Sequence, residues 1–501
     1  MVGSVFLESG RTLARRIKAG ELTSRDLVEQ HIARIERVNS TLNAVVWKRY
    51  QEALEEATTV DASVAKGDAD RLGPYAGVPC TVKECFAFRG KPQTSGLVAR
   101  RDRVARQDAT VITRMRDAGM IPLGGTNVSE LCMWMESDNR VYGRTNNPYD
   151  PSRIVGGSSG GEGAIIGAGA SPFGLGSDVG GSIRMPAFFN GVFGHKPSGG
   201  MVPNSGQFPM PENEVLLYCT TGPLSRRAED LYPLLRLMAG PDAEDTLCRA
   251  FRLGDPADVD ISKLRVIDIP DNGVIDVHPE LRQAQIRARD ALARQGAKVE
   301  TRHFPELAHS VGIWSTMLQA AGGKSFSDML FQGRSTSLVR EWWRLLVGRS
   351  PHTLPALVLA AAERIGPRAP KAAQSALKLG RQLRQALDDA LGDDGVLLYP
   401  SYAEPAPLHR KPVWPPLTVR RSGVDRQLAV STDWAYTAIL NVMQLPATQV
   451  PMGLGADGLP LGVQVGTAYG QDHRSIAVAQ FLEEEFGGWV PPWEAGPHAT
   501  R

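Results

Sequence analysis

Apolar residues recur at helical spacing near the start of the chain. Leu27, Val28, Ile32 and Ile35 share one face of a helix, and Thr23 precedes them at the position of an N-terminal cap. We therefore predict a helix that begins at about residue 24 and packs against a core.

Helical and strand-like patterns continue to alternate along the chain. Further predicted elements are a helix near 108–118, a short buried strand at 120–123, a helix followed by a strand within 280–300, and buried strands at 395–400 and 462–466. Such alternation is typical of an α/β fold, with a parallel or mixed β-sheet covered by helices on both faces. A joint is predicted at 365–372, where Pro367 and Pro370 interrupt the pattern.

Length and composition narrow the class of protein. The 501 residues leave about three domains open, and 42% apolar with 22% charged residues is ordinary for a folded chain. Lys and Arg number 56 against 54 Asp and Glu, which gives a net charge of +2. This near balance argues against a protein whose main task is to neutralise the phosphates of nucleic acid.

Cysteine usage and apolar stretches predict a cytoplasmic protein. The five cysteines show no repeated C-x-x-C spacing, so we expect reduced thiols, no disulfide framework and no metal site. No basic region followed by a long apolar core opens the chain, and no apolar run reaches about 18 residues. We expect neither a signal peptide nor a membrane span. Without a P-loop or a strand-associated G-x-G-x-x-G, no cofactor is expected either.

Glycine is concentrated where serines also gather. Residues 154–200 hold 15 of the 52 glycines, together with Ser158, Ser159 and Ser182. A serine that attacks a carbonyl needs N–H groups aimed at the developing oxyanion, and a glycine frame lets substrate approach the backbone. The candidate donors are successive amides: Val179, Gly180, Gly181 and Ser182. The alternative is a surface loop or an anion-binding nest without catalysis.

A serine nucleophile also requires a base, and Lys83 is a candidate. It lies among apolar neighbours within 77–86, and an apolar setting favours the neutral amine that can accept a proton. A single lysine is more often a solvated surface residue, so Lys83 becomes a candidate through its combination with the serines.

Three motifs together resemble those of the amidase signature family of serine hydrolases. They are Gly-Val-Pro-x-x-x-Lys ending at Lys83, the segment 156–161, and Gly-Gly-Ser ending at Ser182. Spacings of 75 residues from Lys83 to Ser158 and 24 from there to Ser182 fit the same family. The runs that are most similar to its type-2 fatty-acid amide hydrolase branch are 158–163, 184–191, 194–197, 393–395 and 486–490.

The resemblance, which extends over about residues 10–490, implies the organisation of the chain. It implies one amidase domain over 1–501, with a central mixed sheet covered by helices on both faces. The signature core would occupy about 75–230, and a substrate-pocket or lid region about 305–375. Homodimers are common in the family.

A Ser-cisSer-Lys triad is the second implication of the resemblance. Ser182 would be the nucleophile, Ser158 the bridging serine after a cis peptide, and Lys83 the base that acts through Ser158. An acyl-enzyme would form on Ser182 and be released by water. Ser159 and Asp178 would support the surrounding loops. The backbone at or next to Met133 would help to position the base, Lys83.

The segment 157–161 also matches the G-x-S-x-G pattern of an α/β-hydrolase elbow, with Ser159 as nucleophile. That alternative requires a strand directly before it and a later Asp and His, for which His409 and His473 are available. Residues 150–153 make a poor strand. We expect His195 to be a structural hydrogen-bonding residue.

A region rich in apolar residues follows at 311–362. Trp314, Met317 and Trp342 are candidates for a substrate pocket, and arginines interrupt the apolar residues. The region could line a channel, form a lid or touch a lipid surface, so peripheral membrane contact is the most we expect. The alternative is ordinary packing of helices on the sheet.

These patterns favour a cofactor-independent hydrolase of carboxylic amides with a hydrophobic acyl or aryl part. Esters and carbamates are further candidate substrates, because they pass through a similar tetrahedral intermediate. An alternative is the amidotransferase subunit of a tRNA-dependent complex, which shares the triad and works with partner chains. The near-neutral charge and the branch motifs favour the hydrolase.

Overall fold

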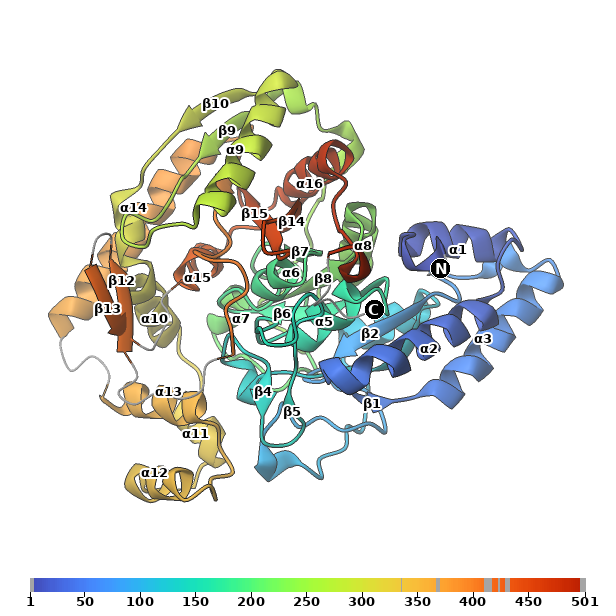
Figure 1. The fold of residues 1–501 in the computed structure, drawn as a ribbon, viewed down its shortest axis with the longest axis horizontal. Coiled ribbons are helices and arrows are strands. Elements are labelled where there is room, and N and C mark those ends of the chain that lie inside the picture. Colours follow the sequence, from blue (N-terminus) through green and yellow to red (C-terminus); the bar gives the residue numbers. More distant parts are fainter. Residues whose placement is uncertain are drawn as a thin grey trace.

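A computed structural model describes residues 4–334, 336–365, 370–409, 417–421, 424–428 and 433–495. The joint expected at 365–372 includes residues 366–369, which lie outside these ranges. Figure 1 shows a central sheet with helices arranged around it.

One mixed sheet of 11 strands organises the chain. Its order is β1 (Val45–Lys48), β3 (Ile121–Thr126), β2 (Pro79–Lys83), β6 (Phe173–Asp178), β8 (Thr220–Ser225), β7 (Phe193–Lys196), β14 (Ala447–Leu454), β15 (Pro460–Thr467), β11 (Gly395–Tyr399), β9 (Arg265–Asp268) and β10 (Lys298–Thr301). Parallel pairs join β2 to β3 and β6, and β9 to β10 and β11. The remaining neighbours are antiparallel. Because one sheet includes strands from both ends of the chain, the protein is a single domain.

Many helices of the described residues lie between successive strands. Their bounds are α1 (Gly10–Lys18), α2 (Ser24–Leu42), α3 (Tyr50–Ala65), α4 (Thr110–Asp117), α5 (Gly160–Gly167), α6 (Arg184–Phe189), α7 (Val215–Tyr218), α8 (Leu231–Met238), α9 (Pro279–Arg294), α10 (Ser310–Ala320), α11 (Phe326–Phe331), α12 (Leu338–Leu346), α13 (Leu354–Ile365), α14 (Pro370–Leu391), α15 (Ala435–Val442) and α16 (Asp472–Phe486). Helices α10 to α14 follow one another between β10 and β11. Two short hairpins stand apart from the sheet: β4 (Asp138–Asn139) with β5 (Gly143–Arg144), and β12 (Leu417–Arg421) with β13 (Val424–Leu428).

The predicted elements are confirmed with small shifts of their ends. The first predicted helix is α2, where Oγ1 of Thr23 accepts a hydrogen bond from the backbone N–H of Asp26 at 3.1 Å. The pattern at 108–123 corresponds to α4 and β3, and that at 280–300 to α9 and β10. Those at 395–400 and 462–466 correspond to β11 and β15. The apolar face of each helix and the short apolar run of each buried strand were sufficient signals for these elements.

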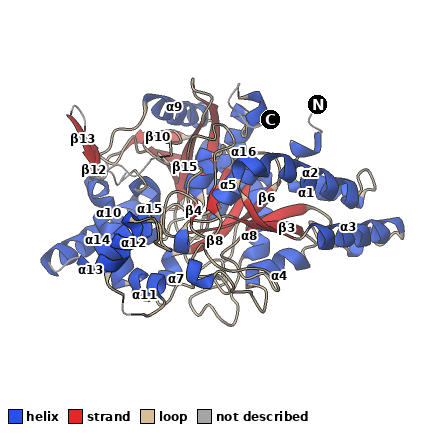
Figure 2. Cartoon of the chain, turned by 60° about the horizontal axis from the view of Figure 1, so that its bottom comes forward, coloured by secondary structure: helices blue, strands red, loops and turns tan. Residues whose placement is uncertain are grey.

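Apolar side chains cover the sheet on both faces, as β11 illustrates. Val396 and Leu398 belong to the same buried cluster as residues of α9 and α16. Leu397 and Tyr399 belong to another cluster, which includes residues of α14 and α15. Since side chains alternate across a strand, two helical layers enclose the sheet, which is also visible in Figure 2.

Three helices, α11, α12 and α13, gather at one end of the molecule, away from most of the sheet (Figure 1). We call them the cap. Their apolar residues form a cluster of their own that includes Leu97 and Leu131 of the main body. Among the described helices, none combines the length and the apolar character that crossing a bilayer requires.

Candidate active site

Strand β2 ends at Lys83, between β3 and β6 in the middle of one half of the sheet. The side chain of Lys83 is fully buried. Its Nζ donates to Oγ of Ser158 at 2.8 Å and to Oγ of Ser177 at 2.9 Å. The buried amine of Lys83 therefore contacts two serine hydroxyl groups.

The segment that carries Ser158 is fixed from two sides. The Gly157–Ser158 peptide bond is cis, the isomer that the sequence resemblance implied. Oγ of Ser137 donates to the carbonyl of Ser158 at 3.3 Å and accepts from the N–H of Gly160 at 3.0 Å. The N–H of Ser159 donates to the carbonyl of Ser182 at 3.3 Å, which brings the two serine segments together.

Ser182 lies in the turn between β6 and α6, beside a buried carboxylate. Asp178 accepts the N–H groups of Gly181 at 2.6 Å and Ile183 at 3.1 Å, and its ion pair with Arg184 measures 3.1 Å. Burial opposes the negative charge of Asp178, but the guanidinium of Arg184 and these hydrogen bonds hold the carboxyl pKa well below its usual range. The turn is therefore anchored to a permanent anion.

Helix α15 completes this network from the far end of the chain. Nδ2 of Asn441 donates to Oδ1 of Asp178 at 3.0 Å, and its Oδ1 accepts from Arg184 at 2.7 Å. Oγ1 of Thr437 donates to the carbonyl of Gly180 at 3.1 Å. At Gly181, where φ is +113°, a side chain would collide with Oγ1 of Thr437. Sequence analysis did not identify Asn441 or Thr437, because no local pattern links them to a turn far away in sequence.

The four amides expected to form an oxyanion hole differ in their hydrogen bonding. The N–H of Gly181 is used by Asp178. Within the described ranges, the N–H groups of Val179, Gly180 and Ser182 have no hydrogen-bond partner. These three amides are therefore available to a ligand beside Ser182.

Two further buried groups surround Lys83 that sequence analysis did not select. Ser177 accepts a hydrogen bond from the Lys83 amine, and Glu162 of α5 lies near the same amine. Glu162 accepts the hydroxyls of Thr81 at 2.7 Å and Thr126 at 3.0 Å. Burial raises the pKa of Glu162 to about 8, against the effect of these hydrogen bonds. The only sequence signal was the position of Glu162 directly after the glycines of 156–161.

Cys132 lies beside Lys83 and Ser158. A hydrogen bond with Cys85, the charge of Lys83 and a hydrogen bond with Ser158 lower the pKa of the Cys132 thiol to about 7, although burial opposes this change. A thiol therefore forms part of the surroundings of the Lys83–Ser158 pair.

The sequence-predicted pocket residues occupy different places. Trp314 contacts the site directly, since its Nε1 donates to the carbonyl of Val179 at 2.8 Å. Met133 and Trp342 are partly buried against the apolar cluster of the cap. Met317 packs near Gly380 of α14. The structure thus brings Trp314 to the turn that carries Ser182 and places the other three in apolar packing.

The cap is joined to the main body through a buried cluster of polar side chains next to these residues. The carboxylate of Glu130 forms hydrogen bonds with Nδ1 of His352 at 2.8 Å, with the backbone N–H of Thr353 at 2.8 Å and with Oγ1 of Thr353 at 2.9 Å. Glu130 is two residues before Cys132, so the join between cap and main body adjoins the Lys83 side of the site.

The α/β-hydrolase alternative does not agree with the structure. No strand precedes Ser159 in 151–158, which are described throughout and contain a single bridging residue, Arg153. Oγ of Ser159 donates to the carbonyl of Ser177 at 3.4 Å. His195 is buried and contacts Thr448 at 2.9 Å and Asp472 at 3.1 Å, in the structural role expected of it.

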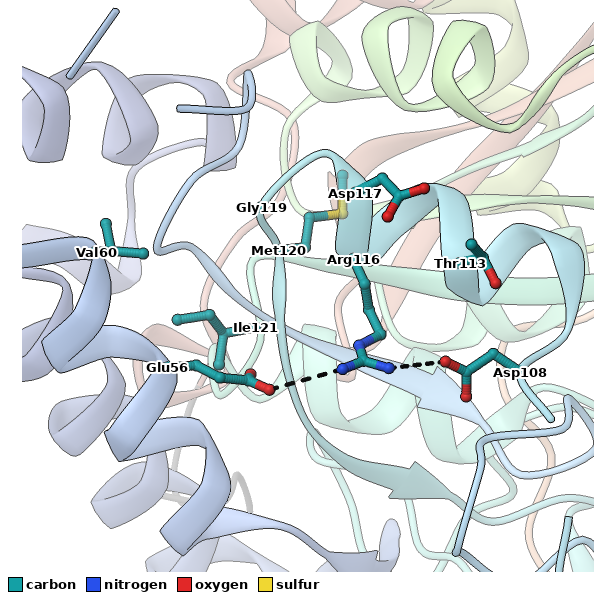
Figure 3. A pocket seen from close by; sticks show the side chains of 9 residues that line it. All are labelled: Glu56, Val60, Asp108, Thr113, Arg116, Asp117, Gly119, Met120 and Ile121. Carbon is teal, nitrogen blue, oxygen red and sulfur yellow. Dashed lines mark hydrogen bonds and ion pairs between the residues drawn. The ribbon is translucent and has the colours of Figure 1, made fainter. Parts of the chain in front are cut away.

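A separate pocket of about 390 Å³ lies between α3 and α4 (Figure 3). There Arg116 bridges Asp108 at 2.7 Å and Glu56 at 4.0 Å. The pocket adjoins Met120 and Ile121, at the opposite end of β3 from Thr126, the residue that pairs with Lys83. It is therefore not part of the serine site. In the part of the chain that the structure describes, no group of His, Cys, Asp or Glu side chains is arranged to hold a metal ion.

Comparison with known proteins places this geometry in a family. The amidase family model matches residues 26–476. The chain is 44% identical to fatty-acid amide hydrolase 2-A of Danio rerio over 505 residues, covering 97% of this chain and 90% of that protein. It is 30% identical to a glutamyl-tRNA(Gln) amidotransferase chain of Chromohalobacter salexigens, covering 94% and 95%. The fold is similar to that of a bacterial aryl acylamidase of the amidase signature family, with a TM-score of 0.78, 22% identity and coverage of 97% and 98%. The chain therefore belongs to the amidase signature family, and it is a hydrolase that acts on carbon–nitrogen bonds of amides.

Proposed function

We propose that the chain hydrolyses carboxylic amides through an acyl-enzyme on Ser182. The observation that carries the proposal is the 2.8 Å contact between Nζ of buried Lys83 and Oγ of Ser158, in a segment bonded to the Ser182 turn. A neutral lysine in that position can accept a proton through one hydroxyl group.

In this mechanism the Oγ of Ser182 attacks the amide carbon and its proton passes through Ser158 to Lys83. The N–H groups of Val179, Gly180 and Ser182 stabilise the oxyanion, and one such donor is typically worth about a hundredfold to a thousandfold in rate. The C–N bond then breaks as the proton returns along the same path to the leaving amine. Water attacks the acyl-enzyme, releases the acid and restores the Ser182 hydroxyl.

Labelling with a fluorophosphonate probe tests the nucleophile. The parent chain should be labelled at Ser182, and Ser182→Ala should abolish both labelling and amide turnover. Ser159→Ala is the matched control, because Ser159 is a neighbouring buried serine in the same site, and it should keep the label. Label that persists in Ser182→Ala and disappears in Ser159→Ala would reverse the assignment.

We also propose that the substrate carries a hydrophobic acyl or aryl group, which the region about 305–375 would accommodate. Its support is the apolar surface of α12, where Val339 is 77%, Trp343 64% and Leu346 83% exposed. The three residues are spaced along one side of the helix, and the similarity to fatty-acid amide hydrolase 2-A points the same way. Turnover of acyl anilides should rise with chain length from acetyl to decanoyl, and equal turnover across the series would contradict this substrate class.

The amidotransferase alternative rests on lower identity, 30% against 44%. It would require partner chains and a tRNA-linked substrate. Purification of the tagged chain from its native cells distinguishes the two functions: the hydrolase should be active without other subunits, whereas a co-purifying partner chain that is required for activity would favour the amidotransferase.

A further inference from the structure

The indole of Trp314 reaches the backbone of the catalytic turn from α10. Its Nε1 donates to the carbonyl of Val179 at 2.8 Å. Its ring is so close to Gly180 that a Cβ there would lie 3.4 Å from it. The indole also lies edge to face against the ring of Trp434, at 4.9 Å between ring centroids and 75° between planes.

This hydrogen bond determines the direction of the Gly180 amide, which has no partner among the described residues. In a trans peptide, the C=O of one residue and the N–H of the next point in opposite directions. The Val179–Gly180 peptide is trans, since neither cis bond of the described residues involves it. With its carbonyl held by Trp314, the N–H of Gly180 must point away from the indole.

The next peptide is held in the same manner by a different side chain. Thr437 donates to the carbonyl of Gly180 at 3.1 Å, and the following N–H, that of Gly181, donates to Asp178 at 2.6 Å. Both peptide planes that flank Gly180 are thereby fixed. Only the first of them leaves its N–H available, because no partner for it occurs among the described residues.

We infer that Trp314 is a positioning residue for the oxyanion hole, whose indole N–H holds the Val179–Gly180 peptide so that the amide of Gly180 is aimed at the substrate oxyanion. The inference rests on the proposed function. A glycine at position 180 rotates easily, and without the indole N–H the peptide can turn its donor away from the site. Preorganised donors are effective because they need no reorientation during the reaction.

Trp314→Phe tests the inference, since it keeps an aromatic ring against Trp434 and removes the donor. With decanoyl p-nitroanilide as substrate, we expect kcat to fall about tenfold and KM to stay within about twofold, a smaller loss than removal of a donor because the amide remains present. Affinity for a decyl trifluoromethyl ketone, which forms an oxyanion on serine, should fall in the same proportion. Affinity for decanol, which has no carbonyl group and forms no oxyanion, should not change.

Trp434→Phe is the matched control, because it removes an indole N–H from the same aromatic pair without touching Val179. It should keep kcat and ketone affinity within about twofold of the parent values. If Trp314→Phe does not fold, 3-benzothienylalanine at position 314 keeps the shape of the indole and replaces its N–H by sulfur, and the same tenfold loss is expected.

Two results would overturn the inference in distinguishable ways. Turnover that depends on Ser182, combined with equal kcat and ketone affinity in Trp314→Phe and Trp434→Phe, would overturn the positioning role alone. Absence of Ser182-dependent turnover in the parent chain would overturn the proposed function and this inference together.

Discussion

Around Asp178, charged and polar side chains are buried and mutually bonded, whereas the cap exposes apolar side chains to solvent. The carboxylate of Asp178 accepts bonds from backbone amides, Arg184 and Asn441. In the cap, Trp343 and Leu346 of α12 are among the most exposed large apolar residues that the structure describes. A catalytic turn needs dipoles that do not move, and an apolar surface tolerates many shapes of ligand. Under the proposed function, chemistry and substrate choice are carried by separate parts of one domain.

The largest effect should follow from removal of the proposed base. Lys83→Ala is expected to lower kcat for amide hydrolysis by about 10²–10⁴, the usual contribution of a positioned general base. Lys324→Ala, a change on the surface near the cap, should leave kcat unchanged. Steady-state hydrolysis of an acyl anilide measures both, and an unchanged rate in Lys83→Ala would remove the base assignment.

Breaking the buried network around Asp178 should lower the free energy of unfolding by more than breaking an exposed ion pair. Arg184→Met leaves Asp178 buried without its cation, and we expect the free energy of unfolding in urea to fall by about 3–5 kcal/mol. Arg25→Met removes an exposed pair with Glu29, at 3.0 Å with the arginine side chain 50% exposed, and should cost under about 1 kcal/mol. Equal losses of unfolding free energy in the two variants would show that burying the Asp178–Arg184 pair adds nothing to its contribution to stability.

A smaller effect is expected where the two regions meet. Glu130→Gln keeps the shape of the side chain and weakens its bonds to His352 and Thr353, so the cap should open locally more often. We expect a loss of about 1–2 kcal/mol in local stability, seen as faster amide hydrogen exchange in α13 with no change in α2. Glu212→Gln, which affects an exposed pair with Lys324, is the control. Uniform acceleration throughout the chain would indicate global destabilisation instead.

A further expected effect is a change in the pH dependence of stability. Burial raises the pKa of Glu162 to about 8 in the folded chain, from an ordinary value of 4.5. Between these values the folded state binds the proton and the unfolded state releases it, so the contribution of Glu162 to stability falls as pH rises from about 5 to 8. The difference in urea unfolding free energy between the parent and Glu162→Gln should decline over that range. Glu485→Gln, at an exposed position, should show no such decline.

The fold was more predictable from sequence than the environment of the site. Helices such as α2 are encoded by local periodicity and strands such as β11 by a short run of apolar residues, so their positions followed from the chain alone. The proximity of Lys83 to Ser158 was anticipated through the family resemblance and not from spacing. The residues that hold the Lys83 amine and the turn that carries Ser182 were not predictable. Ser177 contacts Lys83, and Asn441 and Thr437 contact the turn, only in three dimensions.

Apolar character alone did not show in advance where each predicted pocket residue lies. Trp314, Met317 and Trp342 were selected on apolar character alone, yet Met317 packs near Gly380 and Trp342 against the cap cluster. Apolar composition does not distinguish a residue that lines a binding site from one that fills a core. Trp314 differs by one polar atom, and its bond to Val179 could not be recognised before the fold was known.

The contact between Asn441 and Asp178 spans 263 positions of the sequence, which has a consequence for biosynthesis. At a rate of about 5–20 residues per second, the ribosome makes Ser182 on the order of tens of seconds before it makes α15. Until then the turn that carries Ser182 lacks the side chains that hold its shape. A nascent chain should therefore remain unreactive toward acylating compounds, and competence should arise only when the last third of the polypeptide has been translated and folded onto the earlier part.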